Sequence, residues 1–167
     1  MKAKIAFILG SDSDYPAIEN GVALLRRFAI PVEIEISSAH RTPERTLQLV
    51  RDFEAKEVAV IIAAAGGAAH LPGVVASHTL IPVLGVPIDS PLSGLDSLLS
   101  MVQMPAGVPV ATFGIGAAGA TNAVLFAVSL LALHDPLLAE KLHAFRGEQR
   151  ENVLEKSRKL KAKLASG

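Results

Sequence analysis

The sequence contains no cysteine and no tryptophan, and its aromatic side chains are one tyrosine and six phenylalanines. Without cysteine the chain forms no disulfide and offers no thiolate to a metal. Cysteine usage therefore does not indicate whether the protein works in a reducing or an oxidising compartment. So few aromatic side chains argue against a base-stacking platform for nucleic acid. Sixteen basic and sixteen acidic residues cancel in the formal charge, which gives no reason to expect binding to nucleic acid or to an anionic membrane surface.

Charge is also scarce in the middle of the chain. Between Glu57 and Asp135, histidines aside, Asp89 and Asp96 are the only charged side chains. Prolines and glycines interrupt this stretch, and the unbroken apolar part, 121–133, is shorter than the ~20 residues that a membrane span needs. We therefore expect no membrane partner. The region should instead be buried twice, in the domain core and against other copies of the chain in a homo-oligomer.

The N-terminal apolar run, Ile5–Leu9, ends at Gly10 and is too short for the core of a signal peptide. No cleavage site comes after it. We therefore expect a cytoplasmic protein.

Short apolar runs alternate with helical patterns, which is typical of parallel βα units. The expected strands are 4–9, 32–37, 58–63, 82–86 and 109–113. The second alternates apolar residues with glutamates, which suits an edge strand, while the last three are continuously apolar and should be central. Helices are expected around 18–25, from Thr42-Pro43, and over 94–101. Two more are expected over 121–133, apolar nearly all round and so covered on every side, and from Asp135-Pro136.

These elements predict an α/β fold: a flavodoxin-like, three-layer α/β/α arrangement around a five-stranded parallel sheet. We expect one catalytic domain, 1–167, with a peripheral C-terminal helix at about 135–165. In such sheets ligands bind beyond the carboxyl ends of the strands. That rule selects three loops, which are 10–14, 38–43 and 64–73.

In the first loop, Ser11 and Ser13 stand at the start of a helix, where hydroxyls, backbone amides and the helix dipole suit a phosphate or carboxylate. Helix capping by Ser13 or Asp14 explains the same residues equally well. Asp14 is better placed to accept hydrogen bonds from sugar hydroxyls than to lie beside a phosphate.

In the second loop, Arg41 can bind a phosphate with two hydrogen bonds, and its charge favours a neutral His40 that can accept and return a proton. The alternative is that His40 bonds to the backbone and Arg41 forms a surface ion pair.

The third loop is rich in glycine and alanine, which lets a flat ligand approach the backbone closely. His70 either touches this ligand or, the interpretation we favour, supports the loop. The other histidines, His78, His134 and His143, are isolated and are interpreted as structural. No group of histidines and carboxylates has metal-ligand spacing, so we predict no metal. No serine stands in a recognisable catalytic triad with a histidine and an aspartate.

Four motifs carry a resemblance to a known family. They are Gly10-Ser11-x-Ser13-Asp14, Ser38-Ala39-His40-Arg41-Thr42-Pro43, the run from Gly66 to Gly73, and the run from Asp96 to Pro105. Together they resemble the N5-carboxyaminoimidazole ribonucleotide mutase family, the bacterial mutase branch of the phosphoribosylaminoimidazole carboxylase catalytic subunits. Gly116-x-x-Gly119-Ala120-x-Asn122-Ala123 extends the resemblance to nearly the whole chain.

The resemblance implies a purine biosynthesis enzyme, a cofactor-independent isomerase that assembles as a homo-octamer and acts on a small ribonucleotide. It would interconvert N5-carboxyaminoimidazole ribonucleotide and 4-carboxy-5-aminoimidazole ribonucleotide, with His40 as general acid and base. Ser11, Asp14 and Arg41 would bind the ribose phosphate. The full set of candidate binding residues is Ser11, Ser13, Asp14, Ser38, Ala39, Arg41, Gly66, Gly67, Ala68, His70 and Leu71.

Two alternatives remain open. One is the direct carboxylation of aminoimidazole ribonucleotide by carbon dioxide, and the other is a nucleotide-binding module without catalysis. The branch that carboxylates directly has lysine after the loop histidine and lacks the Gly66–Gly73 run, whereas this chain has Arg41 and the full run. The chain departs from the family's usual residues at Tyr15, Ala64 and Gly114, and Ala64 adds a methyl group beside the ligand loop.

Overall fold

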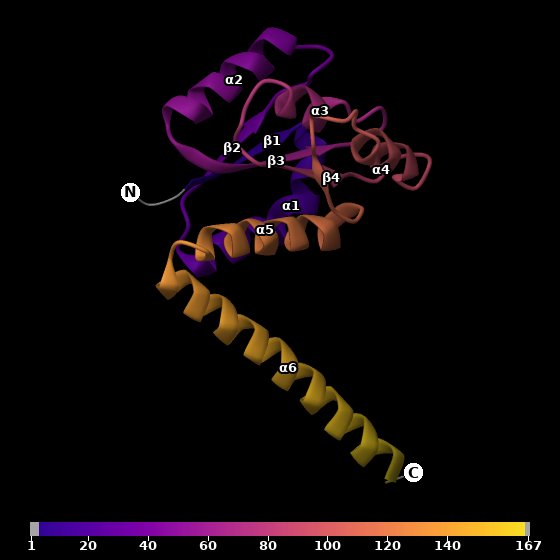
Figure 1. The fold of residues 1–167 in the computed structure, drawn as a ribbon. Helices are drawn as coiled ribbons and strands as arrows, with labels where there is room; N and C mark the ends of the chain where they lie inside the picture. The colour runs from indigo at the N-terminus through magenta and orange to yellow at the C-terminus, as the bar shows by residue number, and fades with distance from the viewer. Residues whose placement is uncertain (1–3, 166–167) are drawn as a thin grey trace. The chain divides into compact units, whose positions relative to one another are not determined.

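Residues 4–165 are described here in a computed structural model (Figure 1). They contain a sheet of five strands in the order β2-β1-β3-β4-β5, and every neighbouring pair is parallel. This order and pairing confirm the predicted flavodoxin-like α/β fold. The strands are β1 (Lys4–Leu9), β2 (Val32–Ile36), β3 (Val58–Ala65), β4 (Val83–Pro87) and β5 (Ala111–Thr112).

Helices cover both faces of the sheet. In Figure 1, α2, α3 and α4 lie on one face, and α1 lies on the other with the first part of α5. Gly21 lets α1 approach α5 closely, because a Cβ at this position would lie 2.9 Å from the Val124 side chain. The helices are η1 (Asp12–Asp14), α1 (Tyr15–Phe28), α2 (Pro43–Ala55), α3 (Leu71–Ala76), α4 (Leu95–Val102), α5 (Gly116–Ala132) and α6 (Pro136–Ala165).

The chain forms two compact units, Met1–Ala127 and Val128–Gly167. The first contains the whole sheet, and the second contains the end of α5 together with α6. That the two units act as one catalytic domain with a peripheral C-terminal helix stays a prediction.

The centre of the sheet is apolar on both faces. β1 pairs with β2 on one side and β3 on the other, and its residues from Ile5 to Leu9 are all buried. β3 is buried along almost its whole length, as its unbroken apolar sequence predicts. Burial on both faces therefore fixes these two strands as the core that carries the loops beyond their carboxyl ends.

The alternating strand β2 lies at the sheet edge, as predicted. Its glutamates pair with basic side chains from α2 and the residue after it: Arg45 Nη2 lies 2.8 Å from Glu35, and Lys56 donates to Glu33. The hydrogen bond to Glu33 raises the pKa of Lys56. The charged positions of this strand thus tie α2, and the loop before it, to the sheet.

The prediction for the fifth strand is wrong in length and position. Only Ala111 and Thr112 pair with β4, and β5 forms the second edge of the sheet instead of a central strand. Pro109 lacks the N–H that a longer ladder requires, which explains the late start.

Two helices differ from expectation. The expected loop 64–73 ends early because α3 begins at Leu71, with Pro72 in its first turn. α5 begins at Gly116 rather than Thr121, and Gly119 near its start packs directly against the backbone of Gly114. The expectation that this helix is covered on every side does not hold within the chain, where Phe126 is 44% exposed. Coverage of that face by another copy stays a prediction.

In the second unit, α6 begins where Asp135-Pro136 predicts it. The Asp135 carboxylate accepts a hydrogen bond of 3.1 Å from the Leu138 N–H and so caps the helix. Leu138, Leu142 and Phe145 are the buried residues of this helix. Across residues 4–165, none of the helices combines the length and apolar character that crossing a membrane requires.

The contact between Gly119 and Gly114 leads to a stability prediction. A Cβ at position 119 would lie 1.5 Å from the Gly114 carbonyl oxygen, so the two backbones must separate in a Gly119→Ala variant. We expect the free energy of unfolding to fall by about 1–3 kcal/mol, the range for overpacked sites. Thermal unfolding at matched chain concentration measures the change.

Gly147→Ala in α6 is the matched control, because nothing lies within 4 Å of a Cβ there. It should leave stability unchanged or raise it by about 0.5–1 kcal/mol through helix propensity. If Gly119→Ala unfolds at the same temperature as the parent, the close contact between the Gly119 and Gly114 backbones is contradicted.

Candidate active site

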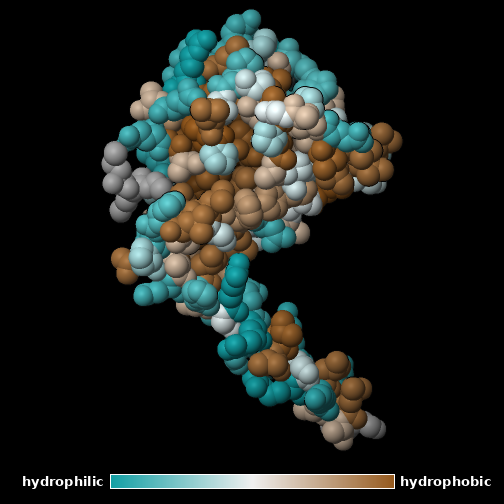
Figure 2. All heavy atoms as spheres, in the orientation of Figure 1, coloured by the Kyte–Doolittle hydropathy of each residue, from teal (hydrophilic) through white to brown (hydrophobic). Residues whose placement is uncertain are grey.

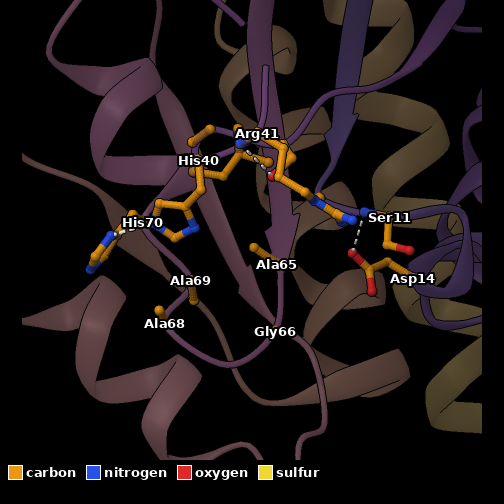
Figure 3. A pocket seen from close by; sticks show the side chains of 13 residues that line it. Ser11, Asp14, His40, Arg41, Ala65, Gly66, Ala68, Ala69 and His70 are labelled. Carbon is orange, nitrogen blue, oxygen red and sulfur yellow. Dashed lines mark hydrogen bonds between the residues drawn. The ribbon is translucent and has the colours of Figure 1, made fainter. Parts of the chain in front are cut away.

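One cavity lies beyond the carboxyl ends of β1, β2 and β3 (Figure 3). Its volume is about 410 Å³, within the range of roughly 300–1,000 Å³ that small-molecule sites occupy. All three loops selected from the sequence contribute to it. The lining residues are Gly10, Ser11, Asp14, Ser38, Ala39, His40, Arg41, Ala65, Gly66, Ala68, Ala69, His70 and Leu71.

The first loop is closed by a reciprocal capping arrangement. Ser11 is the N-cap of η1, and its hydroxyl accepts the Ser13 N–H at 3.3 Å while its own N–H donates to Asp14 Oδ2 at 3.0 Å. Capping therefore falls to Ser11 and Asp14. Both residues also line the cavity, so capping and ligand binding do not exclude each other here.

Asp14 is unusual because its carboxylate is buried. The residue is 7% exposed, and burial raises its pKa above the ordinary value, although the Ser11 N–H opposes the shift. A buried carboxylate of this kind favours additional hydrogen-bond donors. Donors from a ligand in the cavity, such as sugar hydroxyls, would supply them.

The second loop is a hydrogen-bonded turn that carries His40 and Arg41 between Ser38 and Thr42. The Thr42 N–H donates to the Ser38 carbonyl at 2.8 Å, and the Arg41 N–H donates to the Ser38 hydroxyl at 3.3 Å. Thr42 is the N-cap residue that precedes Pro43 of α2, as predicted. Its hydroxyl, however, bonds to Ser38 and does not cap the helix.

The Arg41 guanidinium has no carboxylate partner among residues 4–165, so the predicted alternative of a surface ion pair is not seen in the described chain. Figure 3 shows its side chain extending toward Ser11 and Asp14. A cation without a carboxylate partner at a cavity rim suits a phosphate or carboxylate ligand.

The third loop brings a second imidazole to the first. His70 Nδ1 lies 2.7 Å from His40 Nε2, and the two rings meet edge to face with centroids 4.7 Å apart. Across this contact one ring nitrogen donates the hydrogen bond and the other accepts it, and the tautomers decide which ring does which. His70 thus supports His40 directly, a role that residue type and spacing could not reveal.

The same loop keeps its side chains small where it faces the cavity. Gly67 has a φ of +64° and Ala69 has a φ of +42°, and the Ala69 N–H donates to the Gly66 carbonyl at 3.2 Å. A left-handed conformation is uncommon for alanine and marks a constrained turn. The turn places Ala68 and Ala69 in the cavity lining, below His40 in the view of Figure 3.

Ten of the twelve sequence-predicted site residues line the cavity. The other two, Ser13 and Gly67, lie outside the lining, and their roles in binding stay predictions. Gly10, Ala65 and Ala69 also line the cavity; they lie in the loops selected from the sequence but were not among the candidate binding residues. Their position beside the candidate residues could have indicated them. Glycine and alanine side chains, however, have no functional group that marks a binding residue in a sequence.

Ala64, the departure noted in the sequence, is fully buried in β3, and the lining begins one residue later. No group of three or more histidines, cysteines or carboxylates suited to a metal occurs within residues 4–165.

Comparison with known proteins gives a consistent set of relatives. The family model described as AIR carboxylase matches residues 4–152. A Pseudomonas aeruginosa protein named N5-carboxyaminoimidazole ribonucleotide mutase is 51% identical, covering 93% of this chain and 96% of the relative. A Pyrococcus horikoshii protein with the same name is 49% identical, covering 95% and 89%. The crystal structure of Treponema denticola PurE is similar with a TM-score of 0.86 and 26% identity, covering 95% of this chain and 98% of that one.

The burial of Asp14 predicts a pH-dependent effect of Asp14→Asn. Because the folded chain raises this pKa, the stability that Asp14 contributes is greatest when it is protonated, and it declines as the pH rises through the raised value. Asparagine keeps an oxygen that can accept the Ser11 N–H but carries no charge. The variant should therefore gain thermal stability over the parent as the pH rises from about 4 to about 7.

Thermal unfolding of both proteins across this range, without ligand, measures the difference. The low-pH end is the internal reference, because the parent carboxyl carries the least charge there. A difference that is constant over the range would contradict the burial of this charge.

Proposed function

The chain belongs to the AIR carboxylase family, and we propose that it interconverts N5-carboxyaminoimidazole ribonucleotide and 4-carboxy-5-aminoimidazole ribonucleotide as an isomerase of purine biosynthesis. The observation that carries the proposal is the cavity in which His40, supported by His70, lies beside Arg41, with Ser11 and Asp14 across it. This combination supplies a proton carrier and a phosphosugar site in one place.

Binding depends on the charges around the cavity. Arg41 binds the substrate phosphate together with the hydroxyl of Ser11, which also lines the cavity. Asp14 accepts hydrogen bonds from the ribose hydroxyls, which compensate its buried charge. The aminoimidazole ring then lies over the small third loop, Gly66–Ala69, within reach of His40.

The chemistry needs one proton carrier. In the forward direction the carbamate C–N bond breaks, carbon dioxide leaves, and the exocyclic nitrogen keeps the electron pair and takes up a proton. Carbon dioxide then bonds to ring carbon C4 through a ring electron pair, and loss of the C4 proton returns a pair to the ring. One proton is taken up and one is released, so His40 can donate the first and accept the second.

The reaction as proposed uses no ATP, metal or other cofactor. Its rate arises from holding carbon dioxide and the free aminoimidazole together against Gly66–Ala69, since proximity contributes up to about 7–11 kcal/mol in well-oriented cases. Proton transfer through a positioned imidazole contributes a further factor of ~10²–10⁴. The contact between His70 and His40 keeps the ring in place, and His70 accepts a hydrogen bond when His40 is charged.

We also propose that the chain assembles as a homo-octamer in the cytoplasm, the state and location that the family resemblance implies. Exposed leucine and valine side chains of α4 and the loop before it support association: Leu92, Leu95, Leu99 and Val102. Figure 2 shows a hydrophobic area where Figure 1 places α4. Contiguous exposed apolar side chains often mark a surface that another chain covers. Native mass spectrometry should find eight chains per particle, and a stable monomer would contradict this assembly.

The function is tested by following the decarboxylation of 4-carboxy-5-aminoimidazole ribonucleotide spectrophotometrically, without ATP or metal. The parent should turn over and form the carbamate isomer. His40→Asn should lose at least ~10²-fold in kcat while its affinity for the nucleotide, measured by calorimetry, stays near that of the parent.

Two other results would point elsewhere. Product formed from aminoimidazole ribonucleotide and bicarbonate at physiological concentration, with the carbamate not used, would indicate direct carboxylation. Binding without turnover in a folded parent would leave a nucleotide-binding module.

A further inference from the structure

We propose that two buried hydroxyl groups, those of Ser37 and Thr46, are positioning residues that hold the His40 turn in its catalytic geometry. The inference rests on the proposed function for its catalytic meaning. Neither residue lines the cavity, so neither touches the substrate. Their effect must therefore pass through the turn 38–42, which carries His40 and Arg41.

Burial makes these two hydroxyls structurally important. Thr46 is 0% exposed and Ser37 is 2% exposed. A buried hydroxyl without a hydrogen-bond partner is costly, so each group is constrained to keep the partners that it has. Those partners are the two hydroxyls themselves and Thr42, the last residue of the turn.

The hydrogen bonds form a connected chain. The Thr46 hydroxyl donates to the Thr42 carbonyl at 3.2 Å, and the Thr42 hydroxyl donates to the Ser38 carbonyl at 3.0 Å. With these two protons on the carbonyls, the single proton of the Ser37 hydroxyl is available to one of two neighbours, Thr46 Oγ1 at 2.8 Å or Thr42 Oγ1 at 3.2 Å.

The two ends of this chain are fixed by regular structure. The Ser37 N–H donates to the Leu9 carbonyl at 2.9 Å and so extends the ladder between β2 and β1. The Thr46 N–H donates to the Thr42 carbonyl at 3.1 Å in the first turn of α2. The hydroxyls thus link the end of β2 to the first turn of α2, the two elements that the turn 38–42 connects.

His40 depends on this connection for its position. Its ring nitrogen contacts His70, and the bonds that shape its turn are made by Ser38 and Thr42 on either side. If the hydroxyl chain is broken, the turn can shift relative to β2 while the sheet and α2 stay intact. A displacement of about 1 Å can cost ~10²-fold in rate.

The test compares Thr46→Val, which keeps the shape but removes the hydroxyl, with Thr46→Ser, which keeps the hydroxyl. Thr121→Val is the control for losing a helical threonine hydroxyl, because Thr121 Oγ1 also donates to a carbonyl four residues earlier, at 2.8 Å, but is only partly buried and lies in α5 away from the cavity. Thr46→Val should lower kcat by about 10–100-fold with KM changed less than about threefold, whereas Thr46→Ser and Thr121→Val should stay close to the parent.

Crystal structures of the same variants give a readout that does not depend on turnover. The contact between His40 Nε2 and His70 Nδ1 should lengthen beyond hydrogen-bond distance in Thr46→Val and persist in Thr46→Ser and Thr121→Val. An unmoved turn with unchanged kcat in Thr46→Val would overturn the proposal. If the parent shows no mutase activity, the proposed function fails, and the crystal comparison still decides whether these hydroxyls position the turn.

Ser37→Ala provides a second variant in case Thr46→Val does not fold. It removes the donor and leaves Thr46 bonded to the Thr42 carbonyl, so it should shift the turn in the same direction with a smaller loss of kcat. Parent-like turnover together with a parent-like turn in Ser37→Ala would count against the proposal in the same way.

Discussion

The site depends on the parallel pairing of β1 with a strand on each side. Because the three strands run the same way, the loops after them leave the sheet at one edge. The ladder continues past the regular strands: the Gly10 N–H donates to the Ala64 carbonyl and the Ser37 N–H donates to the Leu9 carbonyl, both at 2.9 Å. These bonds set the starting points of the three loops, and residues of all three loops line the cavity.

Polar groups are buried mainly at this edge. The buried polar or charged residues of the described chain are Asp14, Ser37, Thr46 and Ser97. The first three lie beside the first two loops, and Ser97 donates to the Ile88 carbonyl just beyond β4. The interior elsewhere is apolar, which explains how a sheet of valine, isoleucine and alanine can hold a polar site only where its strands end.

The sequence predicted the first four strands and the three loops, because apolar runs and strand-end position are local signals, whereas the edge position of β5 was missed. The family resemblance seen in the motifs is confirmed by the comparisons. The contact between His70 and His40 was not predictable, since it joins residues thirty positions apart through a turn whose shape depends on Ala69. α3 was missed because six residues are too few for a helical period to appear in the pattern.

The two edges of the sheet are protected in different ways. β2 carries Glu33 and Glu35, both paired with basic side chains at α2, and β5 offers only two residues to a further strand. Short and charged edges discourage the addition of strands from another molecule. Neither edge of the described sheet therefore favours extension by a strand of another chain, so the protein can reach high concentration without entering the β-sheet route to aggregation.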